Sequence, residues 1–506
     1  MTDPSPLAPR ASHLDISRRQ WIVLVCLFLL SLPAVTTRIY SSDEIQYFAY
    51  LRSVWFDRDL SFDNEYRHFY DRGIAKSAGF HETFLERTTD TGRRINFGTV
   101  GCAILWTPFY AVGDVVARVG GWEVNGFSKP YVAAVAYGSA VYGFLALVLA
   151  ILAARRLGYN AFAAAVAIWL GTPLLFYMYV APPFSHACSA FGVALFTYVW
   201  IRVRDRWSVG GLAALGAAGA LMAMVREQDV FFVLGPALDF GLSAFGALGP
   251  KASQSPKPKA QNLIAGAATF AVVFTPQAAA YLILNGHLGP HSSVGRKMNW
   301  MAPHALEVLF SPEHGFFVWT PLALIAIAGL VALFIPPEGV IPPEGGSYRR
   351  EKGNDLVVSA FRRKRQAAVC LLLMVALQIY VGGSVESWTV AGAYGQRRFI
   401  ALTTVMVIGL AALQYGLKSM AARPPSRTRV GVPGLLWGVA ALAVYWNLAL
   451  IAEFSIGLMD RQRLEPRKNA YDAFVTLPRQ APSLIYRYLF DRSSFYRGAG
   501  REAGGA

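Results

Sequence analysis

Two adjacent carboxylates, Asp43 and Glu44, lie a few residues beyond the first apolar block of the chain. The apolar residues that follow, such as Ile45 and Phe48, have helical spacing, so the pair falls in the first turn of a helix at a membrane surface. Two interpretations stay open. Ser41 and Glu44 have the spacing of a capping box, and acidic side chains stabilise a helix N-terminus. Alternatively, a partly desolvated Asp43 can accept a proton from a substrate hydroxyl.

Several arginines lie where an anion could be bound. Arg226 and Glu227 are squeezed between two apolar blocks, and charges at membrane depth usually mark a pathway or a site. Arg397 and Arg398 precede another apolar block on the side where basic residues are not expected, and Arg94 precedes an earlier block. Guanidinium groups bind phosphate through two parallel hydrogen bonds. The arginines therefore predict a phosphate site; an exposed turn and a lipid head-group anchor are the simpler alternatives for the two later positions.

Further polar side chains gather in two later loops. One loop carries His291, Lys297 and His314, and the other carries Glu386. These side chains could clamp a phosphate, or the histidines could hold a divalent metal. No HExxH or other ligand spacing is present, so metal binding has little support from the sequence. A hydrogen-bonded residue at the membrane surface is the simpler explanation for each histidine.

The composition indicates what kind of fold must position these residues. The chain has 506 residues, of which 54% are hydrophobic and only 15% are charged, and its mean hydropathy is +0.37. A soluble domain carries about 25% charged residues. The apolar residues gather in blocks of roughly 15–24, which is close to the length that crosses a hydrocarbon core about 30 Å thick. The sequence therefore predicts an all-α, polytopic integral membrane protein.

About eleven blocks qualify as transmembrane helices. They are Trp21–Val35, Pro130–Ala153, Ala161–Val180, His186–Val203, Ser208–Val225, Val230–Leu248, Leu263–Leu284, Phe316–Phe334, Ala367–Gly382, Phe399–Leu417 and Gly431–Ile451. The block Phe97–Ala117 contains Pro108 and Asp114, and we expect it to be a surface or re-entrant helix. Residues 38–129 then form one long outer loop with interfacial helices.

Basic residues predict the orientation of the spans. They fall on alternate connections, which are cytoplasmic by the positive-inside rule, and comprise Arg155-Arg156 and the clusters at 202–206, 251–259, 349–365 and 418–429. Residues 1–20 are then a cytoplasmic tail, 21–454 the transmembrane module and 455–506 an external tail. These loops account for the net charge of +16, so no nucleic-acid partner is expected.

Four motifs together resemble the GT-C superfamily of membrane glycosyltransferases, most of all the bacterial branch similar to protein O-mannosyltransferases and lipid A aminoarabinose transferases. The motifs are SSDEIQYFAYLRSVWFDRDL from Ser41, WTPFY (Trp106–Tyr110), SPEHGFFVWTP (Ser311–Pro321) and ESWTVAGAYGQRRF (Glu386–Phe399). The resemblance implies an enzyme of the bacterial inner membrane with its active site on the outer face. It also implies a polyprenyl-phosphate-sugar donor and an extracytoplasmic lipid, glycan or protein acceptor.

The resemblance further implies that Asp43 is the catalytic base, with Glu44 beside it. Relatives often carry Lys-Pro-Pro before the second interfacial helix, whereas this chain has Gly98-Thr99-Val100 and then Trp106-Thr107-Pro108. The phosphate ligand must therefore come from elsewhere, and the candidates are Arg94, Arg226, Arg397 and Arg398.

A transporter or flippase for a lipid-linked or anionic substrate is the alternative function. It would predict discontinuous spans at matched positions of two repeated halves. The sequence contains no convincing internal repeat, and its loops are markedly asymmetric. A glycosyltransferase is therefore the favoured prediction.

Overall fold

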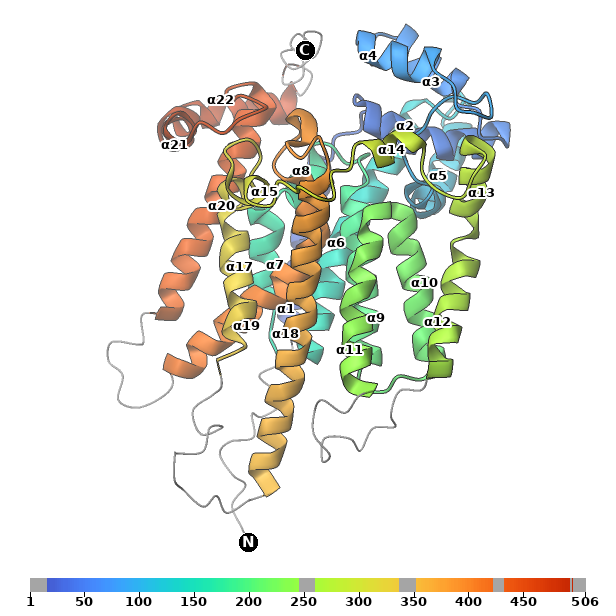
Figure 1. Ribbon diagram of the computed structural model, residues 1–506. Helices are drawn as coiled ribbons and strands as arrows, with labels where there is room; N and C mark the ends of the chain where they lie inside the picture. Colours follow the sequence, from blue (N-terminus) through green and yellow to red (C-terminus); the bar gives the residue numbers. More distant parts are fainter. Residues whose placement is uncertain (1–15, 245–259, 336–351, 422–431, 492–493, 495–506) are drawn as a thin grey trace.

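The protein is described by a computed structural model that covers residues 16–244, 260–335, 352–421, 432–491 and 494. This part of the chain is helical, and its only β-bridges are the isolated pairs Thr88 with Arg94 and Met298 with Val385. Long helices run side by side as a bundle, and short helices cover one end of it (Figure 1). Because α2 (Ser42–Arg52) lies there, we call it the α2 end. The prediction of an all-α fold is confirmed for the described residues.

The helices divide between the bundle and its α2 end. The bundle consists of α1 (Arg18–Ser31), α6 (Lys129–Arg156), α7 (Phe162–Gly171), α9 (His186–Val203), α10 (Val209–Val225), α11 (Leu234–Ala244), α12 (Ala260–Val273), α13 (Thr275–Asn285), α17 (Pro321–Ala332), α18 (Lys352–Ser384), α19 (Thr403–Ala421) and α20 (Val432–Ile456). The α2 end also carries α3 (Asp63–Asp71), α4 (Ala78–Phe80), α5 (Gly101–Val119), α8 (Leu174–Tyr179), α14 (Ser292–Arg296), α15 (Glu307–Phe310), α16 (Phe316–Trp319), α21 (Pro466–Tyr471) and α22 (Leu477–Phe490) (Figure 1).

Six described helical segments are long and apolar enough to cross a membrane. Five of them coincide with predicted spans: α6, α9, Ala360–Ser384 of α18, Arg397–Met420 and Pro433–Ile456. The pair α12 and α13 adds a seventh if it is counted as one span, and its two helices meet at an angle of 49°. The other predicted spans are short or interrupted, so the number eleven stays a prediction.

The short and interrupted spans have local causes. Helix α1 has only 14 residues, and α10 has 17. Pro173, Pro276 and Pro321 lie at the breaks between α7 and α8, between α12 and α13 and between α16 and α17. Proline lacks the N–H that would continue the preceding helix, and it is favoured at the start of the next one.

The sixth apolar segment is α5, which the sequence predicted as a surface or re-entrant helix. Gly101 of α5 packs directly against the backbone of Met224 at the last turn of α10, and Gly113 packs against Pro130 at the first turn of α6. Both contacts lie at the α2 end, where α5 extends across the ends of the bundle helices (Figure 1). The contacts favour the surface arrangement, while length and composition alone would also allow a crossing.

A buried cluster fixes the short helices to the bundle. It contains Phe48 of α2, Tyr66 of α3 and Trp106 of α5 together with Met224 of α10. The indole of Trp106 donates a hydrogen bond of 2.9 Å to Ser139 of α6. The first turn of α2 is therefore held against the bundle by packing on its following turns.

Some predictions fall on residues outside the described ranges. Of the predicted cytoplasmic tail, residues 16–20 are described, and of the predicted external tail, residues 455–491 and 494. The latter form α21 and α22. The basic clusters at 251–259 and 423–429 lie outside the described residues.

Candidate functional site

The first turn of α2 is fixed by a capping box. The Ser41 hydroxyl accepts a hydrogen bond of 3.3 Å from the Glu44 backbone N–H. The Glu44 carboxylate accepts hydrogen bonds from the backbone N–H groups of Tyr40 and Ser41 at 2.9 and 3.0 Å. Glu44 is fully buried, and this burial raises its pKa to about 8. The capping interpretation therefore describes Glu44, whose side chain is used to hold the helix end.

Asp43, the neighbouring carboxylate, forms an ion pair with a residue far along the chain. Its Oδ2 lies 2.8 Å from Nη1 of Arg397, and the side chains are 39% and 17% exposed. Arg397 opens the 3₁₀ turn Arg397–Leu402 that leads into α19. Its guanidinium also lies 5.3 Å from the centre of the Phe184 ring. Asp43 is thus anchored against the bundle while part of its carboxylate stays accessible.

A second arginine reaches the same region from α10. Arg226 follows the last residue of α10, and its Nη1 lies 3.2 Å from Nδ1 of His186. His186 is the first residue of α9, is buried, and stacks on Phe184. Phe184 therefore contacts both Arg397 and His186, which is the partner of Arg226. This shared contact joins the two arginines into one site.

Arg398 completes the group that we call the arginine cluster, Arg226, Arg397 and Arg398. Its buried guanidinium donates hydrogen bonds to the carbonyl and hydroxyl oxygens of Ser387 at 2.9 and 3.3 Å. All three arginines lie close enough to act electrostatically on His186, and Asp43 acts on Arg398.

The cluster carries more positive than negative charge. Among the described residues, neither Arg226 nor Arg398 forms an ion pair with a carboxylate, although Asp229 is near enough to act on Arg226. Charged groups that are buried are stabilised by an opposite charge. Two carboxylates, Asp43 and Asp229, therefore face three guanidinium groups, and an anionic ligand would complete the balance.

Three other predicted residues contact none of the three arginines of this cluster directly. Arg94 pairs with Asp63 at 2.7 Å and belongs to the packing of α3. His291 accepts a hydrogen bond from the backbone N–H of Ser293 and caps α14. Lys297 lies 6.0 Å from the centre of a phenylalanine ring in the same region. The partners of Arg94 and His291 therefore lie outside the arginine cluster, whereas the Lys297 carbonyl accepts a hydrogen bond of 2.8 Å from the backbone N–H of Glu386, the neighbour of Ser387.

The remaining predicted residues have other surroundings. Glu227 is half-buried, and the loss of solvent around it raises its pKa. It accepts a hydrogen bond from the Tyr281 hydroxyl. Glu386 is exposed. His314 is buried and stacks on Trp319 with the ring centres 4.7 Å apart, and burial lowers its pKa to about 4. His314 is near Arg397, yet it is neutral at pH 7 and adds no charge there.

No described group of three His, Cys, Asp or Glu side chains could hold a metal ion. His291 and His314, which the sequence offered as metal ligands, also lie in different packing environments.

The sequence interpretation missed three residues of the site. His186 opens an apolar span, Tyr47 lies one turn beyond Asp43, and Ser387 receives the Arg398 hydrogen bonds. Tyr47 is partly buried and lies near enough to interact electrostatically with both Asp43 and Arg226. The position of His186 at the edge of an apolar block could have marked it as a site residue, because titratable groups at membrane depth are costly. Tyr47 and Ser387 carried no such signal.

The chain matches no family model and no curated protein.

Proposed function

We propose that the chain is a GT-C-type glycosyltransferase of the bacterial inner membrane. It transfers a sugar from a polyprenyl-phosphate-linked donor to a lipid, glycan or protein acceptor on the extracytoplasmic side. One observation carries the proposal: an accessible carboxylate, Asp43, pairs with Arg397 at the edge of a three-arginine cluster. Transfer of a sugar from a phosphate needs a proton acceptor and an anion site side by side.

Asp43 is the proposed catalytic base. The acceptor oxygen attacks C1 of the sugar, its proton passes to the Asp43 carboxylate, and the bond between C1 and the phosphate oxygen breaks. Among the described residues only Arg397 forms an ion pair with Asp43, and it does so through Oδ2. The Arg397 pair therefore orients the carboxylate, and Oδ1 is the proposed proton acceptor.

The arginine cluster is the proposed site of the leaving group. When the C1–O bond breaks, its electron pair stays on the phosphate and adds one negative charge. Arg226 and Arg398 are held by His186 and Ser387, so their positions are set before the donor binds. Preorganised donors of this kind contribute about 10²- to 10³-fold each to the rate when they meet developing charge.

The test compares wild type with Asp43→Asn and with Asp205→Asn as a matched control. Asp205 is exposed and follows the opposite end of α9. Purified proteins in liposomes receive a radiolabelled polyprenyl-phosphate sugar and membrane acceptors. Loss of a general base predicts that Asp43→Asn lowers kcat by about 10²- to 10⁴-fold, whereas Asp205→Asn stays within twofold of wild type.

Two outcomes would overturn the proposal. Undiminished transfer by a folded Asp43→Asn protein would remove Asp43 as the base. Movement of the intact lipid-linked sugar across the liposome membrane without cleavage of the C1–O bond would instead identify a flippase. Equal elution volumes and melting temperatures for the three proteins show that folding is not the cause.

A further inference from the structure

Two cysteines from distant parts of the chain meet beside the arginine cluster. Cys102 is the second residue of α5, and Cys188 is the third residue of α9. Both are fully buried in the cluster that fixes the short helices to the bundle, and their thiols share a side-chain hydrogen bond. Arg226 is near enough to act electrostatically on Cys102. The pair therefore lies at the α2 end, next to one member of the arginine cluster.

Packing on both sides of the pair holds α5 and α9 together. Gly101, the neighbour of Cys102, lies directly against the backbone of α10. One turn further along, the Tyr142 hydroxyl of α6 donates a hydrogen bond of 2.8 Å to the Leu105 carbonyl of α5. The Tyr142 ring also lies 4.8 Å from the Phe191 ring of α9, measured between ring centres. Leu105 and Phe191 each lie three residues after a cysteine of the pair, so Tyr142 supports the contact between the thiols.

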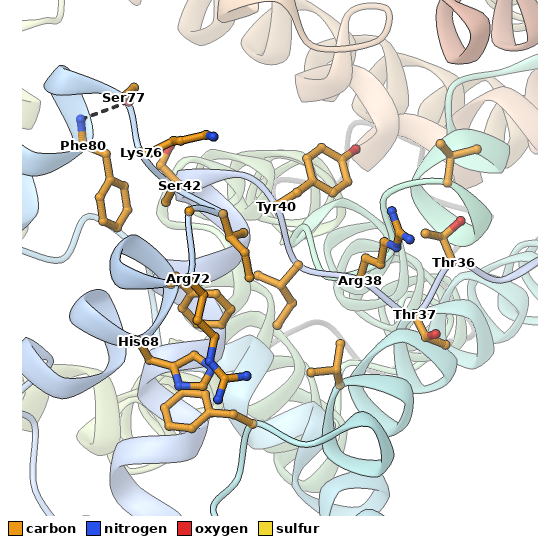
Figure 2. A pocket seen from close by; sticks show the side chains of 18 of the residues that line it. Thr36, Thr37, Arg38, Tyr40, Ser42, His68, Arg72, Lys76, Ser77 and Phe80 are labelled. Carbon is orange, nitrogen blue, oxygen red and sulfur yellow. Dashed lines mark hydrogen bonds between the residues drawn. The ribbon is translucent and has the colours of Figure 1, made fainter. Parts of the chain in front are cut away.

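The large cavity at the α2 end does not reach the pair. Its volume is about 1070 Å³, and its wall includes the segment that leads into α2, parts of α3 and α4, the start of α6 and the ends of α8 and α20. Figure 2 shows Arg38 and Tyr40 from the first of these segments, with Arg72 across the space. Neither cysteine is among the described lining residues. Water-soluble reductants that enter this cavity therefore do not meet the thiols.

We propose that Cys102 and Cys188 form a disulfide that ties α5 to α9 beside the arginine cluster. Each thiol loses its proton and a sulfur–sulfur bond forms between the two side chains. The two electrons and two protons pass to the disulfide of a thiol oxidant, which is reduced to two thiols. Such oxidants act outside the cytoplasm, so this inference rests on the extracytoplasmic location of the α2 end in the proposed function. Because both sulfurs are buried once the chain is folded, the bond forms while α5 and α9 are packing.

The disulfide restrains one contact of the arginine cluster. His186, the partner of Arg226, lies two residues before Cys188 in α9. On the other side, the residue before Cys102 packs against the last turn of α10, which ends just before Arg226. A covalent link between α5 and α9 therefore fixes the two supports of the contact between Arg226 and His186 relative to each other.

Counting thiols in the full-length protein tests the bond. Bacterial cells that make the protein are quenched with acid and dissolved in SDS with N-ethylmaleimide, which blocks every free thiol. The purified chain is then reduced and labelled with a polyethylene-glycol maleimide, which adds visible mass to each new thiol. Wild type should gain two tags, and Cys188→Ala should gain none because Cys102 has lost its partner. Cys370→Ala is the matched control, because Cys370 is also buried but belongs to α18, and it should gain two tags.

Three results would overturn the inference. Wild type without tags after reduction would show that both thiols stay free. Tags in Cys188→Ala would show that Cys102 pairs with another cysteine. Protein made with dithiothreitol in the growth medium should have four free thiols and melt about 4 °C or more below the oxidised protein, because a disulfide that closes a long loop stabilises the fold. Equal melting temperatures would show that the bond restrains nothing.

Sugar-transfer assays separate this inference from the proposed function. If wild type transfers sugar but gains no tags, the disulfide is refuted and the glycosyltransferase proposal stands. If wild type gains two tags but cleaves no polyprenyl-phosphate sugar, the glycosyltransferase proposal fails, whereas the disulfide and the extracytoplasmic location of the α2 end stand.

Discussion

Arg397 and Arg398 are adjacent in the chain but have different partners. Arg397 pairs with Asp43 at 2.8 Å, whereas Arg398 is satisfied by the uncharged oxygens of Ser387. Neutral acceptors reduce the cost of burying a guanidinium group without cancelling its charge. Arg398 therefore keeps its attraction for an anion, and Arg397 keeps the base oriented. The two residues divide the tasks of binding and positioning.

Arg398→Gln should weaken binding of polyprenyl phosphate at least tenfold. Hydrogen bonds to charged groups contribute about 1.5–3 kcal/mol each, and 1.4 kcal/mol corresponds to tenfold in affinity. The dissociation constant is measured from the rise in melting temperature with ligand concentration, since a ligand that binds only the folded state stabilises it. Arg94→Gln is the control, because Arg94 pairs with Asp63 outside the cluster. Equal weakening in both variants would contradict the assigned phosphate site.

Glu44→Gln should flatten the dependence of stability on pH. Burial raises the pKa of Glu44 to about 8 from its ordinary 4.5. Between these values the folded protein keeps a proton that the unfolded chain has released, so the free energy of unfolding falls as the pH rises through this range. Glutamine still offers an oxygen to the N–H groups of Tyr40 and Ser41 but does not titrate.

Melting temperatures of both proteins, measured across this range in one detergent, check the Glu44 prediction. Glu65 is also buried, with its pKa raised to about 7, and it titrates in both proteins. The difference between wild type and Glu44→Gln therefore isolates Glu44. Parallel curves would show that Glu44 does not hold the extra proton.

Residue types in the sequence identified the four charged residues of the site but not its three other members. Charged side chains near apolar blocks are costly to bury and usually mark a functional site. This rule identified Asp43, Arg226, Arg397 and Arg398. The structure brings these four together. Arg94 also lies beside an apolar block, and only the fold shows that it forms an ion pair with Asp63. Which charges meet is decided by tertiary packing, which a single sequence does not contain.

Helices α10 and α12 pack so closely that their contact requires glycine. A β-carbon on Gly216 of α10 would overlap the carbonyl oxygen of Gly266 in α12. Small residues let helix backbones approach in lipid, where dispersion contacts replace the hydrophobic effect as the main attraction. Because α10 ends at Val225, just before Arg226, this packing also sets where Arg226 enters the arginine cluster.

Gly216→Ala should lower the free energy of unfolding by about 1–3 kcal/mol, the usual cost of overpacking. Gly210→Ala in the same helix is the matched control, because a β-carbon there meets nothing within 4 Å. It should stay within about 1 kcal/mol of wild type, which is the size of the helix propensity difference. Chemical unfolding in mixed micelles measures both, and equal stability of the two variants would exclude close packing at Gly216.

The apolar blocks predicted the positions of the helices more accurately than the breaks between them. All the predicted spans overlap described helices, because block length follows from membrane thickness. The prolines at 173, 276 and 321 were visible in the sequence, but a hydropathy window averages over them. The 49° bend between α12 and α13 depends on what each half packs against, so the sequence alone could mark the break but not its angle.

The end of the bundle opposite the α2 end carries its own set of basic residues. Helix α6 starts at the α2 end and finishes with Arg155 and Arg156, and α9 starts at His186 and ends next to Arg204. Lys364 lies against the ring of Tyr159, just beyond the end of α6. These residues lie opposite the α2 end, and the positive-inside rule makes that end the predicted cytoplasmic face.

The ion pair between Asp43 and Arg397 limits the topology further. Two residues that touch lie on the same side of a membrane, so the chain between them must cross it an even number of times. The eight predicted spans from Pro130–Ala153 to Ala367–Gly382 satisfy this condition. A ninth crossing by α5 would place Asp43 and Arg397 on opposite sides. If all eight predicted spans cross, the ion pair therefore requires that α5 does not.

Cysteine labelling tests this topology in intact cells. Single cysteines replace Glu86, Glu123 and Asp205 in a protein whose exposed Cys26 is changed to serine; the other three cysteines are buried. An impermeant maleimide should label Glu86→Cys and Glu123→Cys from outside, and Asp205→Cys only after permeabilisation. Glu86 and Glu123 flank α5, so labelling from opposite sides would mean that α5 crosses. In that case another interrupted segment between residues 43 and 397 must fail to cross, because the ion pair still requires an even number.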